Sequence, residues 1–264
     1  MLEASCRLDD DGDMHRLAFT LLLTTLLSIG CRPMADQNVL LDEHFNNLDH
    51  WHLEGQKQAI SIPSPGQLRL ACESTMGQVG AMAFYTQDFP DNICIEYDLI
   101  VENHNGLLIT FVAMQGVHGE DAITGVPERS GVFDDYVGEK ASTRSYHVSV
   151  CRYMDDGVHS GVSNWRRNPG LHLMVSGKDL CTEINKPYHV KICKQGPHCW
   201  VDVNGERGTE FTDPQRLPGP IPTVGKFGFR AIGAKAFFRI SNVKVTSRPS
   251  ASVCSAMSAS VFTG

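Results

Sequence analysis

The sequence lacks the motifs of the large nucleotide-binding enzyme classes. It contains neither a Walker phosphate loop nor the glycine pattern of a dinucleotide-binding turn. Positive charge is also scarce, because 23 lysines and arginines stand against 30 aspartates and glutamates and the formal net charge is -7. Contacts to nucleic-acid phosphates need a basic face. We therefore expect no nucleic-acid partner.

Long apolar runs are missing except for one short segment near the N-terminus. Leu17 to Ile29 holds only apolar and hydroxyl-bearing residues, which is too short for a permanent membrane span but typical of the core of a secretory signal. The segment closes on Leu-Ser-Ile-Gly-Cys31, which resembles a bacterial lipoprotein signal. The acidic residues 1–13 are foreign to such a signal, which favours a translation start at Met14. We expect export to the periplasm or cell envelope, with contact with the membrane only through a lipid on Cys31. The alternative is an ordinary cleaved signal in which Cys31 has no role.

Cysteines with the spacing of a metal site are also absent. None of the nine cysteines shows the C-x-x-C spacing of a zinc site. Disulfides persist outside the cytosol, and Cys193 and Cys199 flank a hairpin-like turn. The spacing predicts a disulfide between these two residues, and the alternative is that both are reduced thiols in the core.

The sequence lacks the apolar spacing of long helices and has instead the alternating pattern of short strands. No long stretch keeps apolar residues at i, i+3, i+4 and i+7 with caps. Residues 95–101 instead alternate between apolar and polar side chains, and similar runs recur from Val39 to Ser247 between Gly, Pro, Asn and Asp. We predict an all-β, two-sheet antiparallel jelly-roll sandwich over residues 39–248. A leader and short linker (1–38) precede it, and a Ser- and Ala-rich tail (249–264) that we expect to be disordered follows it.

Several motifs of the predicted sandwich resemble a known superfamily. They are Leu-Asp-Glu-His-Phe-Asn-Asn-Leu-Asp-His-Trp (41–51), Val-Asp-Val-Asn-Gly (201–205) and Gly-Lys-Phe-Gly-Phe-Arg (225–230), and they look like the concanavalin A-like lectin/glucanase superfamily. Ser-Tyr-His-Val-Ser (145–149) and Asn-Trp-Arg-Arg-Asn-Pro-Gly (164–170) are similar to the YesU-like family of uncharacterised bacterial proteins. The resemblance implies a concanavalin A-like fold and a glycan as the partner.

The predicted strand that contains Glu96 carries several carboxylates, as does the catalytic strand of some sandwich glucanases. Glu96, Asp98 and Glu102 share a face by parity. At ordinary strand rise the outer two lie about 20 Å apart, whereas retaining cleavage needs carboxyl groups about 5 Å apart. We therefore interpret this strand as a polar outer face, and Glu96 remains only an alternative for a hydrolase.

A second segment concentrates the side chains that suit sugar recognition. On the strand that begins at Ser145, parity places His147 and Ser149 on the polar face, which in a jelly roll is the concave groove. Histidine serves as acid or base near neutral pH, arginine presents a planar fork to carboxylate or sulfate, and tryptophan a face for a sugar ring. We expect a groove around His147, with substrate-binding residues Arg144, Asn164, Trp165, Arg166 and Arg167.

The partner that these residues predict is an acidic or polyhydroxylated oligosaccharide or polysaccharide. If the protein is a lyase, Tyr146 or His147 would abstract a proton next to a uronate carboxylate that Arg166 or Arg167 neutralises. If it is a hydrolase, Asp134, Asp135 or Glu96 would supply the carboxylate. The alternatives are a non-catalytic carbohydrate-binding lipoprotein and a structural or protein-interaction sandwich.

The acidic loop before these residues does not have the pattern of a metal site. Asp134 and Asp135 follow Glu120 and Asp121 in one long loop, and calcium is the metal that such carboxylates would favour. Calcium needs six to eight oxygens from a compact loop, and that spacing is absent. We predict no metal and no cofactor, and the alternative is a calcium ion bound by these carboxylates.

Overall fold

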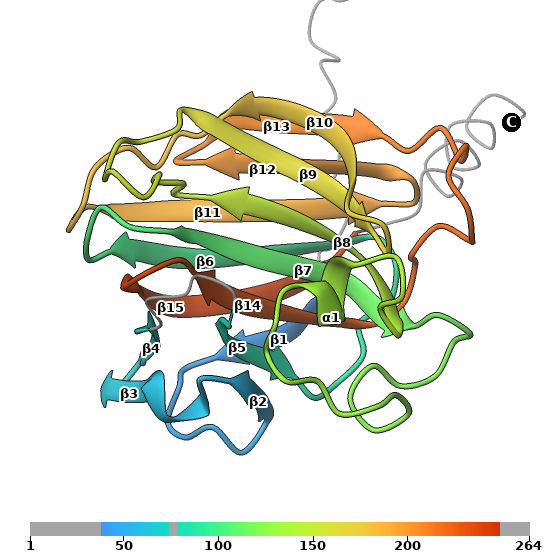
Figure 1. The fold of residues 1–264 in the computed structure, drawn as a ribbon, viewed down its shortest axis with the longest axis horizontal. Coiled ribbons are helices and arrows are strands. Elements are labelled where there is room, and N and C mark those ends of the chain that lie inside the picture. The colour runs from blue at the N-terminus through green and yellow to red at the C-terminus, as the bar shows by residue number, and fades with distance from the viewer. Residues whose placement is uncertain (1–37, 74–78, 249–264) are drawn as a thin grey trace, which may run out of the picture. The chain divides into compact units, whose positions relative to one another are not determined.

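The computed structural model describes residues 38–73 and 79–248. These residues form two antiparallel sheets that pack face to face (Figure 1). The first sheet has the order β13-β12-β11-β6-β15-β4-β3, with β1 paired to β15. Its strands are β1 (Val39–Glu43), β3 (Ile60–Ser64), β4 (Gln67–Cys72), β6 (Ile93–Val101), β11 (Pro187–Gln195), β12 (His198–Val203), β13 (Glu206–Thr212) and β15 (Ala236–Ser247).

The second sheet has the order β10-β9-β8-β7-β14-β5-β2. Its strands are β2 (Trp51–Gly55), β5 (Ala81–Tyr85), β7 (Leu107–Gly116), β8 (Thr143–Val150), β9 (Val162–Asn168), β10 (His172–Lys178) and β14 (Lys226–Ile232). The only helices in the described part are η1 (Lys57–Ala59) and α1 (Asp134–Val137), and none there is long and apolar enough to cross a membrane. The predicted all-β sandwich is confirmed. The leader with Cys31 and the tail 249–264 lie outside the described residues, so what we expect of them stays a prediction.

The core lies between the sheets and follows from the alternation of each strand. In β6 the side chains of Ile95, Tyr97 and Leu99 are fully buried, and the ring of Tyr97 lies 5.0 Å from that of Phe229 on β14. Glu96 points to the outer face, where it pairs with Lys191 of β11 at 2.7 Å. The outward polar face expected for β6 is therefore present, on the sheet opposite to β8 and β9.

A second apolar cluster covers the outer face of the seven-stranded sheet. The connection between β7 and β8, which carries α1, folds back over this face (Figure 1). Tyr136 and Val137 of α1 pack there against Phe84 and Phe111 of the sheet. This packing leaves an open part of the same face beside β8 and β9.

The disulfide of the described residues differs from the predicted one. Cys193 on β11 is bonded to Cys94 on β6, because these residues are direct partners across the two strands. Cys199 is opposite Lys194 in the β11–β12 register, so it faces the core while Cys193 lies on the outer face with Trp200. The predicted Cys193–Cys199 bond is wrong, and Cys199 is a buried thiol.

We expect the Cys94–Cys193 link to be found in the purified protein. Alkylation of the unreduced, denatured protein should leave these two cysteines unmodified and alkylate Cys199, and peptide mass spectrometry should show the crosslinked pair. The bond spans 99 residues of sequence, and a crosslink of that span stabilises a fold by about 4 to 5 kcal/mol in the chain-entropy model. A peptide that links Cys193 to Cys199 would contradict this assignment.

Candidate functional site

A cavity of about 450 Å³ opens on the outer face of the seven-stranded sheet, beside β8 and β9. We call it the His147 cavity. Its apolar wall comes from Leu107, Ile109, Phe133, Leu171 and Ile232, and its polar groups come from His147, Ser149, Arg152, Asp155, Asn164 and Arg166. An apolar wall with a few converging polar groups is the usual composition of a small-molecule site.

Strand register explains why four polar side chains gather at this place. In the β8–β9 pair His147 is opposite Arg166, and Ser149 is opposite Asn164. Alternation sends all four side chains to the same face, because direct partners point to one side of a sheet. Ser176 of β10 donates to the Asn164 side-chain oxygen at 2.7 Å, which orients that amide at the cavity.

His147 is held in one orientation and one protonation state. Only 2% of the residue is exposed, and the Asn168 amide nitrogen lies 2.8 Å from its Nδ1. An amide NH₂ group only donates, so Nδ1 is the acceptor and the ring proton is on Nε2. Burial, with the positive charges of Arg166 and Arg230, lowers the pKa of His147 to about 3. At neutral pH His147 is therefore an uncharged hydrogen-bond donor whose other nitrogen is already engaged.

Arg166 reaches the cavity from β9. Its Nη1 donates to the Leu171 carbonyl at 2.7 Å, and burial together with the charge of Arg152 lowers its pKa. Among the arginines in the described ranges, ion pairs with carboxylates are formed by, for example, Arg69, Arg129, Arg167, Arg207 and Arg239. Arg152 and Arg166 form no such pair there, so the cavity holds two cations without an acidic partner.

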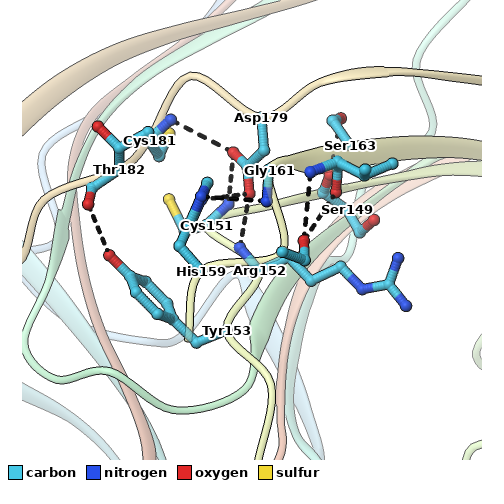
Figure 2. A network of polar contacts seen from close by, with 12 residues as sticks. Ser149, Cys151, Arg152, Tyr153, His159, Gly161, Ser163, Asp179, Cys181 and Thr182 are labelled. Atoms are coloured by element: carbon cyan, nitrogen blue, oxygen red, sulfur yellow. Dashed lines mark hydrogen bonds and ion pairs between the residues drawn. The ribbon is translucent and has the colours of Figure 1, made fainter. Parts of the chain in front are cut away.

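Arg152 is placed by the buried carboxylate of Asp179, as Figure 2 shows. The backbone N–H groups of Cys151 and Arg152 donate to Asp179 at 3.0 and 2.6 Å, and that of Cys181 donates at 3.3 Å. His159 Nε2 lies 3.1 Å from the same carboxylate. Burial raises the pKa of Asp179.

These contacts support a bend directly after β8. Cys151 has a φ of 54°, a backbone conformation that residues with a side chain rarely adopt. The bend turns the chain so that Arg152 and Tyr153 line the cavity, and the Arg152 guanidinium extends away from Asp179 (Figure 2). Asp179 thus acts as a positioning residue for the cavity wall.

A buried carboxylate also anchors the β7–β8 connection. Glu54 on β2 accepts two hydrogen bonds from Arg129, at 3.0 and 2.5 Å, and one from the Tyr136 hydroxyl. Burial is the largest cause that raises the pKa of Tyr136, and the neighbouring Glu54 charge raises it further. Because Tyr136 follows Phe133 by one helical turn, this network holds the Phe133 ring at the cavity.

The structure brings together three of the residues that the sequence suggested. His147, Asn164 and Arg166 line the His147 cavity. Sequence reasoning did not assign Arg152 or Phe133 to the site. Arg152 could have been suspected, because it lies between positions 136 and 168, where arginine and aromatic residues are concentrated. Phe133 stands in a loop with no periodicity to locate it.

Three other predicted residues lie in the core, which corrects their expected roles. Trp165 is fully buried and packs against Phe211, so it offers no face to a sugar. The Tyr146 hydroxyl donates to Asp213 at 2.5 Å, and Arg167 pairs with the same carboxylate at 3.0 Å. Successive side chains of a strand point to opposite faces of the sheet. Tyr146 therefore points away from the face of its neighbour His147, and Trp165 and Arg167 point away from the face of Arg166. All three side chains lie between the sheets.

The remaining candidates lie away from the His147 cavity. Arg144 donates to the Val117 carbonyl and the Gln115 side chain at 3.0 and 2.7 Å, and it lines a separate cavity of about 200 Å³. Asp134 and Asp135 line a third hollow beside Lys140. Asp135 accepts hydrogen bonds from the Ser130 backbone and hydroxyl at 2.8 and 2.7 Å. The structure therefore does not bring these carboxylates to His147.

The described residues also bear on the question of a metal site. The described ranges 38–73 and 79–248 contain no group of three or more His, Cys, Asp or Glu side chains that could hold a metal ion. In the acidic loop Asp121 pairs with Lys226 at 2.7 Å and accepts backbone hydrogen bonds from Ile123 and Thr124. That carboxylate therefore stabilises the loop and Lys226. The absence of a cofactor stays a prediction.

Comparison with known proteins places the chain in a family. It is 29% identical over 201 residues to the uncharacterised protein YesU of Bacillus subtilis, across 74% of this chain and 88% of YesU. A crystal structure of a Bacillus subtilis protein of unknown function with a galectin-like fold matches with a TM-score of 0.71 and 24% identity, over 81% of this chain and 99% of that one. The carbohydrate recognition domain of Emp46p matches with a TM-score of 0.51 and 12% identity, over 80% of this chain and 98% of that domain. Residues 37–243 match the model of the domain of unknown function DUF1961, and the chain therefore belongs to the DUF1961 family.

Proposed function

We propose that this protein binds an oligosaccharide in the His147 cavity and does not cleave it. The contact between the Asn168 amide nitrogen and Nδ1 of His147, at 2.8 Å, is the observation that carries the proposal. The Nδ1 atom accepts from Asn168 and the Nε2 atom carries the proton, so the ring offers a donor to a sugar hydroxyl and no lone pair to a substrate proton. Because its pKa is about 3, His147 is also not protonated to the imidazolium at neutral pH, so it has no second ring proton to give to a substrate as a general acid.

The rest of the cavity suits a pyranose ring. Ile109, Phe133 and Leu171 supply an apolar surface for the C–H groups of the ring, and Ser149 and Asn164 supply hydrogen-bonding groups for its hydroxyls. The similarity of fold to a carbohydrate recognition domain supports the same ligand class. Of the proposed catalytic groups, Tyr146 lies in the core, while Asp134 and Asp135 lie at another hollow. A binding protein is therefore the function that the geometry favours over a lyase or a hydrolase.

The proposal includes export of the protein, with a lipid anchor at Cys31. The Cys94–Cys193 disulfide supports export, because such bonds persist in oxidising compartments. An exported binding protein would hold polysaccharide fragments at the cell surface.

A glycan array followed by calorimetry tests the binding site. The array should hold neutral, uronate-containing and sulfated oligosaccharides, and the wild-type protein should retain at least one class without shortening it. Asn164→Ala and His147→Gln should each weaken binding about 5- to 100-fold, the usual effect of a lost hydrogen bond in a site. The matched control is His189→Gln, because His189 is an exposed histidine on the other sheet, paired with Glu96 and Asp98. Failure to retain any glycan, or equal affinity in folded cavity variants, would contradict the proposal, and shortened oligosaccharides would show an enzyme instead.

A further inference from the structure

We infer that the sugar residue in the His147 cavity is a uronic acid, and that its carboxylate lies between Arg152 and Arg166. This inference rests on the proposed function and narrows its ligand to one chemical class. It comes from the charges that meet at the cavity and from the way in which the fold places them.

Two guanidinium groups reach the cavity from separate parts of the chain. Arg166 comes from β9, and Arg152 comes from the bend after β8. They are close enough for the charge of one to disfavour the charge of the other. Two like charges in a half-buried place repel each other, and an anion between them would turn this repulsion into attraction.

No group of the described residues neutralises this pair. Within residues 38–73 and 79–248, neither Arg152 nor Arg166 forms an ion pair with a carboxylate, in contrast to Arg69, Arg129, Arg167, Arg207 and Arg239. Asp155 lines the same cavity but is exposed and pairs with neither arginine. His147 is uncharged at neutral pH and neither adds to nor offsets the charge. A chain with a net charge of -7 thus keeps a local positive site in its cavity.

The fold orients both side chains without using up their capacity to bind an anion. Asp179 holds the backbone of Arg152 and leaves its guanidinium extended (Figure 2). Arg166 uses Nη1 for the Leu171 carbonyl, and its other side-chain N–H groups form no hydrogen bond with the part of the chain that the structure describes. Guanidinium groups bind carboxylates with two parallel hydrogen bonds, which is the strongest pairing that this geometry permits.

The ligand must also fill the apolar and neutral parts of the cavity. A small free anion would leave Ile109, Phe133 and Leu171 uncovered, whereas a sugar ring would lie on them. A uronic acid joins both features, because its carboxylate is attached directly to C5 of the ring. A sulfate ester shares the negative charge, so the experiment must separate these two sources.

Titration calorimetry with matched oligosaccharides tests the inference. The probes are oligogalacturonates and oligoglucuronates, their methyl esters of the same length, and sulfated oligosaccharides of neutral sugars. The wild-type protein should bind one uronate series at least ten-fold more tightly than its methyl ester, and raising the salt concentration should weaken only the acid. Arg152→Gln and Arg166→Gln should each weaken binding of the acid about 10- to 100-fold and leave binding of the ester nearly unchanged.

The controls separate this inference from the proposed function. Arg207→Gln removes an arginine that pairs with Asp202 on the other sheet, and it should leave all affinities unchanged. Arg166→Lys keeps the charge without the fork and should fall between wild type and Arg166→Gln, which also tests the site if the glutamine variant folds poorly. Equal binding of acid and ester, or tighter binding of the sulfated probes, would overturn the uronate assignment while sugar binding stands. No binding of any probe would overturn the proposed function itself.

Discussion

Arg167→Ala is expected to lower the free energy of unfolding by about 3 to 5 kcal/mol, which is the usual cost of breaking a buried ion pair from one side. Arg167 is 3% exposed and bonds to Asp213 at 3.0 Å. Its Nη2 also donates to the carbonyls of residues 218–220. Removal of the side chain would leave the Asp213 carboxylate buried, with Tyr146 as its remaining side-chain donor.

Arg166→Ala is the matched control, because the same residue type stands next in sequence on the opposite face. Arg166 is half-buried at the cavity and forms no ion pair. Its loss should change the free energy of unfolding by less than about 1 kcal/mol, as is usual for a partly exposed position. Urea denaturation of both variants at neutral pH measures the difference. Equal losses of stability, or a loss for Arg167→Ala below about 1 kcal/mol, would contradict the assignment of Arg167 to the core and Arg166 to the cavity.

Acidification is expected to destabilise the wild-type protein through His147. Its pKa is about 3 in the folded state and about 6.5 in an unfolded chain. Between these two values the unfolded state binds the proton and the folded state does not, so stability falls as the pH decreases from about 6.5 towards 3. At pH 4.5 the loss from this one group is about 2 to 3 kcal/mol relative to neutral pH.

The pH dependence of a variant isolates this contribution. His147→Gln removes the titrating ring and keeps a polar side chain that can contact Asn168. Urea denaturation of wild type and variant between pH 7.5 and 4.5 should show a free energy of unfolding that falls by about 2 to 3 kcal/mol more in the wild type. All other titrating groups are common to both proteins and cancel in the comparison. Parallel curves would show that His147 is as easily protonated in the folded protein as in the unfolded one.

The two predictions come from one strand pair in which neighbouring residues have opposite roles. Alternation along β8 correctly predicted that His147 and Ser149 share the face opposite to the core, to which Tyr146 and Val148 belong. The same alternation on β9 separates Arg166 from Trp165, and it could have assigned Arg167 to the core. Arg167 and Trp165 were instead expected at the site because their side chains suit sugar binding. Their place on the strand, and not their residue type, decided that both lie in the core.

Local sequence determined the strands of this protein and, through their alternation, the direction of most side chains, because the two-residue period of an extended chain is a property of the backbone alone. Only the tertiary structure decided which strands are neighbours. Cys193 is bonded to Cys94 since β11 lies beside β6 as well as β12, and the site receives Arg152 since Asp179 binds the bend after β8 from 27 residues farther along the chain. Such contacts depend on the packing and register of whole sheets, and no local pattern in the sequence records them.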